Sequence, residues 1–122
     1  HYAVAMHGLE QLRQVSLPAD LVRYLFMGQD YAAEAALVCV LSADFERCMC
    51  KYGDRGYRYL LLEAGHAMQN LNLIAAALGL GSCNLGGFFD VELSDLLRLD
   101  LAHEQALYAV AIGPEVDSDA TA

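Results

Sequence analysis

Apolar residues recur at helical spacing in three stretches of the chain. The first predicts a short helix that Ser16 caps and Gly28 ends, with Pro18 in its first turn. The longest spans residues 57–78, about six turns, and is apolar on nearly every face, so it predicts a helix enclosed by other protein surface. The third predicts a helix capped by Asp90, with a buried stripe formed by Val91, Leu93, Leu96 and Leu97.

Strand-like runs lie between these helices. Residues 35–41 are continuously apolar and include Val38 and Val40, which predicts a central strand covered on both faces. Residues 1–6, 82–85 and 106–112 predict further strands, and residues 43–49 predict one or two helical turns. Helices and strands therefore interleave, and the expected fold class is α+β or α/β, with a sheet packed against the long helix.

The composition limits the kinds of partner this protein can have. Of the 122 residues 57% are hydrophobic and the mean hydropathy is +0.30, so part of the surface is expected to meet a partner. Seven Lys and Arg against sixteen Asp and Glu give a formal charge of −9, which argues against nucleic-acid binding. Polar residues such as Glu63 and His66 interrupt the longest apolar tract, and no signal peptide opens the chain, so no membrane span is expected.

The four cysteines give no metal-binding pattern, because the paired CxxC spacing of a zinc site is missing. Cys39 and Cys83 lie in apolar runs and are interpreted as small buried residues, which suits a reducing cytoplasm. Glu63-x-x-His66 has the spacing of a di-iron ligand pair, but a second such pair is missing. A hydrogen-bonded pair on the helix surface or at an interface is the favoured interpretation.

Two short segments could carry chemistry. Lys51 and Tyr52 stand beside glycines in an expected polar loop, residues 51–56, where an amine and a phenol could transfer protons over a ligand. Taken alone, the segment is more typical of a solvated loop, and Arg55 and Arg58 could either hold a phosphate or form surface ion pairs. In Leu85-Gly86-Gly87-Phe88, two adjacent glycines after a strand would let a flat ring approach backbone N–H groups, or would form an ordinary tight turn.

Read together, these segments resemble the SagB-type dehydrogenases of the nitroreductase superfamily. The resemblance is carried by Lys51-Tyr52-Gly53-Asp54-Arg55-Gly56-Tyr57-Arg58-Tyr59, Leu62-Glu63-Ala64-Gly65-His66 and Gln69-Asn70-Leu71. It continues through Ala77-Leu78-Gly79-Leu80-Gly81, Gly86-Gly87-Phe88 with Asp90, and Leu107-Tyr108 with Gly113 and Pro114. Residues 1–114 are therefore expected to be the C-terminal part of a nitroreductase-like domain whose N-terminal part is missing, followed by a flexible acidic tail, residues 115–122.

The resemblance implies an FMN-dependent oxidoreductase of the cytoplasm that dehydrogenates azolines to thiazoles or oxazoles in ribosomal peptides, with oxygen reoxidising the flavin. It also implies a homodimer through the long helix, residues 57–78, with flavins between the subunits. The family's catalytic Lys-Tyr pair corresponds to Lys51 and Tyr52. The turn that approaches the flavin ring corresponds to Gly86 and Gly87 with Leu85 before them, and Arg55 is a candidate FMN contact.

The sequence departs from the family pattern where the FMN phosphate is held. The Arg-x-Ser-x-Arg and Pro-Ser-x-Gly segments of nitroreductases are not in this chain, and no Lys or Arg follows Gly113. These contacts are expected from an N-terminal segment or a partner chain. Two alternatives stay open: a nitroreductase-like dimerisation or scaffold domain without catalysis, and a generic NAD(P)H-dependent nitroreductase acting on small molecules. Lys51 and Tyr52 argue against the second, because that reaction needs no such general base.

Overall fold

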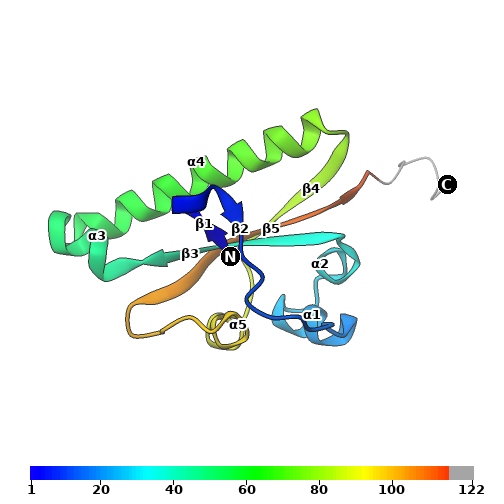
Figure 1. Ribbon diagram of the computed structural model, residues 1–122, viewed down its shortest axis with the longest axis horizontal. Helices are drawn as coiled ribbons and strands as arrows, with labels where there is room; N and C mark the ends of the chain where they lie inside the picture. Colours follow the sequence, from blue (N-terminus) through cyan, green and yellow to red (C-terminus); the bar gives the residue numbers. More distant parts are fainter. Residues whose placement is uncertain (116–122) are drawn as a thin grey trace.

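The computed structural model describes residues 1–115 and confirms a mixed fold of helices and antiparallel strands (Figure 1). Three strands form the main sheet in the order β3-β5-β4, and two short strands pair near the N-terminus. The elements in chain order are β1 (Tyr2–Ala3), a 3-10 turn (Val4–Met6), β2 (Gly8–Leu9), α1 (Ala19–Leu25), α2 (Asp30–Glu34), β3 (Leu37–Asp44), α3 (Phe45–Tyr52), α4 (Arg55–Ala77), β4 (Leu80–Leu85), α5 (Asp90–Leu97) and β5 (Glu104–Pro114).

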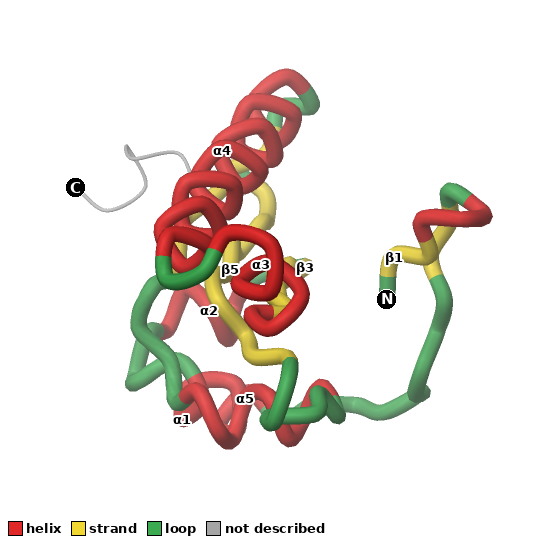
Figure 2. Tube along the Cα trace, turned by 90° about the vertical axis from the view of Figure 1, so that its left-hand side faces the viewer, coloured by secondary structure: helices red, strands yellow, loops and turns green. Residues whose placement is uncertain are grey.

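Helices cover both faces of the main sheet, so the domain has three layers (Figures 1 and 2). The long helix α4 lies on one face, where Met68 and Ala75 pack against Val110 and Ile112 of β5. Helices α1, α2 and α5 lie on the other face, around a core that contains Leu25, Phe26, Ala32, Leu85, Phe88, Leu93, Ala106, Ala109 and Ala111. Because alternate residues of β5 point into different layers, Ala106 and residues 109–112 are buried, and Leu107 and Tyr108 are partly buried.

The central strand is β5, and the prediction that residues 35–41 form it was wrong. Strand β3 lies at an edge, paired only on its β5 side within residues 1–115, from Leu37 opposite Ile112 to Asp44 opposite Glu104. Its two faces are nevertheless covered: Val38 and Val40 pack on the α1/α5 side, and Cys39 and Leu41 on the α4 side. The apolar side chains of β3 thus indicated that helices cover both of its faces. They carry no information about how many strands are hydrogen-bonded to it.

Two predicted helix caps were wrong, although the helices themselves are confirmed. Helix α1 follows Pro18, whose carbonyl accepts from the N–H groups of Leu21 and Val22, so Ser16 lies outside the helix. Helix α5 begins after Phe89, and Asp90 occupies its first turn. An acidic side chain in that position still favours the helix through the dipole of the first turn.

Helix α4 confirms the predicted long helix and contacts the sheet along one side only. The buried residues of that side are small or flexible, namely Ala64, Met68 and Ala75, which lets the helix axis approach the strands. The opposite side exposes large apolar side chains, among them Leu62 at 54% and Leu73 at 60%. The sheet therefore covers one side of this helix, and the predicted cover on the other side is not provided by residues 1–115. Within the described part of the chain, no helix is both long and apolar enough to cross a membrane.

The N-terminal segment forms a small hairpin and not the single strand predicted for residues 1–6. Tyr2 pairs with Leu9, and Ala3 with Gly8, around the turn Val4–Met6. The hairpin stands apart from the three layers (Figure 2), and further along the segment Arg13 donates to the carbonyl of Leu96 at 2.8 Å. Apart from Glu115, the predicted tail, residues 115–122, lies outside the described residues.

Candidate active site

Lys51 and Tyr52 lie in the last turn of α3, and the loop predicted for residues 51–56 shrinks to Gly53 and Asp54. Asp44 caps α3 by accepting from the N–H of Arg47 at 2.9 Å, and Gly53, with φ of +59°, ends it. A helix holds the two side chains more firmly than a loop would. The Lys51 ammonium stands 5.0 Å from the centre of the Tyr52 ring.

The Tyr52 ring is oriented by α4. It meets the Tyr59 ring edge-on, with 5.1 Å between the ring centres and an interplanar angle of 88°. Buried Gly56, at the start of α4, brings the two helices together, because a Cβ there would lie 3.0 Å from the Cα of Met49. The phenol and the amine therefore have a fixed frame built from α3 and α4.

A cavity of about 590 Å³ opens beside this pair, between α3, α4 and the edge strand β3. Besides Lys51, Tyr52 and Glu63, the lining includes polar or reactive side chains that the sequence analysis did not select, namely Ser42, Asp44, Arg47 and Cys48. Helical spacing could have found part of this set, because residues 44, 48 and 51 recur at intervals of three and four and so share one face of α3.

The double-glycine turn follows strand β4. Leu85 is fully buried in the core, its backbone included, so it leaves the contact with a ligand to the residues that follow it. At Gly86 an added Cβ would meet nothing within 4 Å, and the N–H groups of Gly86 and Gly87 donate to no acceptor within residues 1–115. At Gly87 a Cβ would stand 3.4 Å from Nε2 of Gln29. The open approach to these free donors is therefore at Gly86.

The structure separates the Lys51-Tyr52 pair from the double-glycine turn. The pair flanks β3 and the turn follows β4, at opposite edges of the sheet and two strand spacings, about 10 Å, apart. The two features also contact α4 at different points along its axis. Asn84, just before the turn, accepts from Asn72 at 3.0 Å. Tyr59, which contacts Tyr52, lies thirteen residues, or about 20 Å, before Asn72 in that helix. Gly86 and Gly87 line no part of the Lys51-Tyr52 cavity.

Arg55 belongs to the same end of the molecule as Lys51 and Tyr52. It is the first residue of α4, seventeen residues before Asn72, so about 25 Å of helix separates it from the contact beside the turn. Its side chain is exposed. The residues expected to hold FMN therefore fall into two groups within one chain.

The di-iron spacing of Glu63 and His66 does not bring these side chains together. Glu63 lines the Lys51-Tyr52 cavity, whereas His66 is exposed and its Nδ1 donates to the carbonyl of Leu62 at 2.6 Å. Among residues 1–115, no group of three or more His, Cys, Asp and Glu side chains is arranged to hold a metal ion. Both side chains are exposed on the helix surface, but within residues 1–115 they do not form the predicted hydrogen bond with each other.

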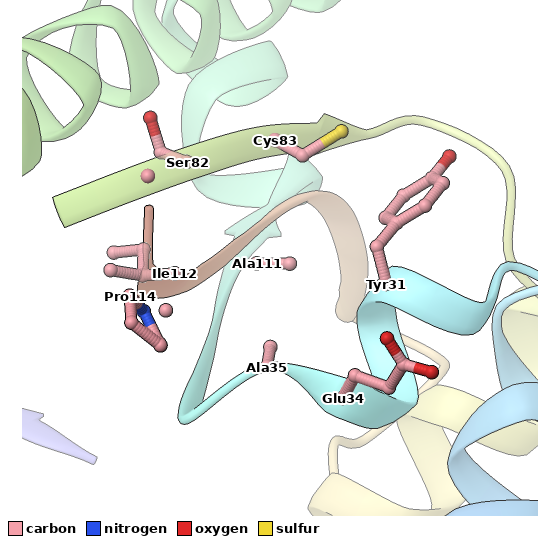
Figure 3. Close-up of a pocket in the computed structure, with 10 residues that line it drawn as sticks. Tyr31, Glu34, Ala35, Ser82, Cys83, Ala111, Ile112 and Pro114 are labelled. Carbon is pink, nitrogen blue, oxygen red and sulfur yellow. The ribbon is translucent and has the colours of Figure 1, made fainter. Parts of the chain in front are cut away.

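A second, smaller cavity of about 250 Å³ lies between α2 and the strands β4 and β5. Tyr31 and Glu34 border it from α2, and Cys83 borders it from β4, with its thiol toward Tyr31 (Figure 3). Cys83 is exposed, so the prediction of burial was wrong for this residue, because it lies on the edge strand β4. Cys39 is partly buried, and burial raises the pKa of its thiol.

Comparison with known proteins identifies relatives of most of the chain. The profile of the nitroreductase family matches residues 2–114. The nitroreductase-type protein MJ1384 of Methanocaldococcus jannaschii is 37% identical over 89 residues, which are 73% of this chain and 43% of that protein. The microcin B17-processing protein McbC of Escherichia coli is 35% identical over 66 residues, which are 54% of this chain and 23% of McbC. The chain thus spans less than half the length of these curated relatives.

Solved structures share the arrangement of helices and strands. The Escherichia coli microcin synthetase complex McbBCD, with truncated pro-MccB17 bound, matches 96% of this chain and 44% of its own chain, with a TM-score of 0.85 and 28% identity. A nitroreductase-type protein from Anabaena variabilis matches 80% of this chain and 20% of its own, with a TM-score of 0.74 and 36% identity. The three-layer fold is therefore that of known proteins.

Proposed function

Because this chain belongs to the nitroreductase family, we propose that it is part of an FMN-dependent oxidoreductase that dehydrogenates azolines to azoles in ribosomal peptides. The observation that carries the proposal is the Lys51-Tyr52 pair, held by α3 and α4 at the mouth of a large cavity. The similarity to McbC, a microcin-processing protein, supports a peptide substrate. Four free cysteines suit the reducing cytoplasm in which such a pathway would run.

The double-glycine turn fits a flavin ring. Open space at Gly86 and two unused N–H donors beside it match the edge of a flat heterocycle that carries acceptor atoms. When bound, FMN would supply the acceptor for a hydride. Lys51 or Tyr52 would take the proton that leaves the azoline ring, so that one hydride and one proton together account for the new double bond.

A second copy of the chain is needed to complete this site. Proton removal and hydride acceptance must act on the same small ring, where reacting atoms lie about 3–3.5 Å apart. Within one chain Lys51 and Tyr52 lie more than about 10 Å from the turn, across the width of the sheet. The exposed apolar side of α4, away from the sheet, offers the contact surface, through Leu62, Leu73 and Ile74.

Mixing two inactive variants tests this arrangement. Lys51→Ala removes the amine, and Gly86→Val fills the open approach to the turn. If each site combines groups from two copies, a mixed dimer has one intact site and one doubly damaged site, and activity returns on mixing. If each site lies within one chain, every site keeps one defect and mixing restores nothing. The wild-type protein is the control, assayed on a thiazoline peptide by mass spectrometry.

An absorption spectrum with and without added FMN tests the proposal as a whole. A flavin band that stays with the protein through gel filtration is expected. A colourless protein that ignores FMN would favour the scaffold alternative.

A nitroreductase that uses NAD(P)H is the second candidate, favoured by the 73% of the chain that matches MJ1384 against 54% for McbC. It predicts reduction of a nitroaromatic compound and no change in a thiazoline peptide. That pair of outcomes would reject azoline oxidation.

A further inference from the structure

We propose that Gln29 is the positioning residue of the double-glycine turn: its side-chain amide holds the carbonyl of Gly87 and so sets the direction of the N–H groups of Gly86 and Gly87. The inference rests on the proposed function, because it assigns to Gln29 a part in presenting those donors to a flavin. Gln29 lies between α1 and α2, fifty-eight residues before Gly87 in the sequence.

The Gln29 amide is fully used. Its Nε2 donates to the carbonyl of Gly87 at 2.8 Å and to the carbonyl of Phe26 at 2.8 Å, and its Oε1 accepts from the Tyr31 hydroxyl. An amide nitrogen has two donor hydrogens, so both are engaged. The carbonyls of Phe26 and Gly87 can only accept, so they fix which end of the amide faces them, because a flipped amide would set oxygen against oxygen. The Tyr31 hydroxyl supports this orientation by donating to Oε1.

The residue type at position 87 fits this contact. A Cβ on Gly87 would lie 3.4 Å from Gln29 Nε2 and 3.6 Å from Met27 Sδ, whereas a Cβ on Gly86 would meet nothing. The two positions therefore differ: Gly86 leaves the outer approach open, whereas a Cβ on Gly87 would reach van der Waals contact with the Gln29 amide. This difference was not visible in the sequence, where the two residues look equivalent.

Two consecutive glycines need an external anchor. Without Cβ atoms they reach more backbone conformations than any other pair of residues, so free N–H groups on them would point in many directions. The N–H of Phe89 donates to the carbonyl of Leu25 at 2.9 Å, which ties down the end of the turn. Gln29 holds its middle, and the two anchors together leave the donors preorganised.

The test compares Gln29→Leu and Gln29→Glu with the wild-type protein. Gln29→Leu removes the donor, and Gln29→Glu keeps the shape but sets a carboxylate against the Gly87 carbonyl. Gln14→Glu, on the exposed N-terminal segment, controls for the added charge. Tyr31→Phe removes only the hydroxyl that donates to the amide oxygen, so it is a milder variant that remains informative if the other two fail to fold.

Two readouts separate positioning from general stability. In protein without FMN, ¹⁵N order parameters of Gly86 and Gly87 should fall from about 0.85, the value of rigid backbone, to below about 0.6 in the Gln29 variants, while β5 stays rigid. With FMN, the preference for reduced over oxidised flavin should fall about tenfold, which for a two-electron couple is about 30 mV. Tyr31→Phe should shift both readouts in the same direction by less.

The possible outcomes are distinguishable. Unchanged order parameters and an unchanged flavin preference in both Gln29 variants would overturn the assignment. Equal changes in Gln14→Glu would overturn it as well. A wild-type protein that binds no FMN would instead defeat the proposed function, and the order parameters would still decide whether Gln29 holds the turn.

Discussion

The contact between α3 and α4 at Gly56 can be tested by adding one methyl group. In Gly56→Ala the new Cβ would lie 3.0 Å from the Cα of Met49 and 3.1 Å from both the backbone nitrogen of Met49 and the carbonyl carbon of Cys48. These are backbone atoms of α3, which cannot rotate away as a flexible side chain could. The two helices must therefore separate by several tenths of an ångström.

Two opposing effects set the size of the change. Overpacking of a closely packed site costs about 1–3 kcal/mol, and replacing glycine by alanine inside a helix returns about 1 kcal/mol. Gly65→Ala is the matched control, because it lies in the same helix and its Cβ would meet nothing within 4 Å. We expect Gly65→Ala to be stabilising by about 1 kcal/mol and Gly56→Ala to be destabilising by up to about 2 kcal/mol.

Urea denaturation of both variants, monitored by circular dichroism, measures the difference in their free energies of unfolding. Repeating it at several protein concentrations shows whether Gly65 lies in a contact between copies. In a thermal scan each kcal/mol corresponds to about 4–8 °C in Tm for a domain of roughly this size. Because α3 carries Lys51 and Tyr52, turnover should fall in Gly56→Ala as well. Equal stabilisation by the two substitutions would refute the close approach of α3 and α4.

Other substitutions address the remaining parts of the molecule. Tyr52→Phe should leave FMN binding intact and lower azoline dehydrogenation by about two to four orders of magnitude, as measured in steady-state assays; unchanged turnover would exclude the phenol from proton transfer. Ser94→Ala should destabilise the fold by about 1–3 kcal/mol in urea, because the Ser94 hydroxyl is fully buried and accepts from the N–H of Ala106 at 3.2 Å; a neutral result would mean that another acceptor replaces it. Between pH 7 and 9, alkylation of Cys39 should lag behind that of exposed Cys83, because burial raises the Cys39 pKa and lowers its thiolate fraction; mass mapping that finds equal rates would contradict this.

The order of helices and strands was readable from the sequence because each apolar run has a length and period of its own. Helix α4 and strands β4 and β5 lie within a few residues of their predicted bounds. The sheet order was not readable, since the apolar run of residues 35–41 reports helix cover on both faces and not its neighbours. The predicted cap of α1 was also wrong, because the carbonyl of Pro18 accepts from the N–H groups at the start of the helix, a role that was expected of the Ser16 hydroxyl.

The candidate site was readable only as short segments. The Lys51-Tyr52 pair and the double-glycine turn acquired their roles only through the family resemblance, because the same residue types also occur in ordinary solvated loops and tight turns. Their separation depends on the sheet order, which the sequence did not reveal. Gln29 was missed because an isolated glutamine between two helices gives no periodic signal, and its partner Gly87 is fifty-eight residues away.

Because one side of α4 is exposed and apolar, the stability of the protein is expected to depend on its concentration. A dimer that shields this side gains stability with protein concentration, by about 1.4 kcal/mol for every tenfold rise, because dilution favours the separated form. At low concentration the separated form would expose the apolar side of α4 to water, where proteases and chaperones recognise it. Abundance would thereby decide whether the protein persists, before any question of substrate arises.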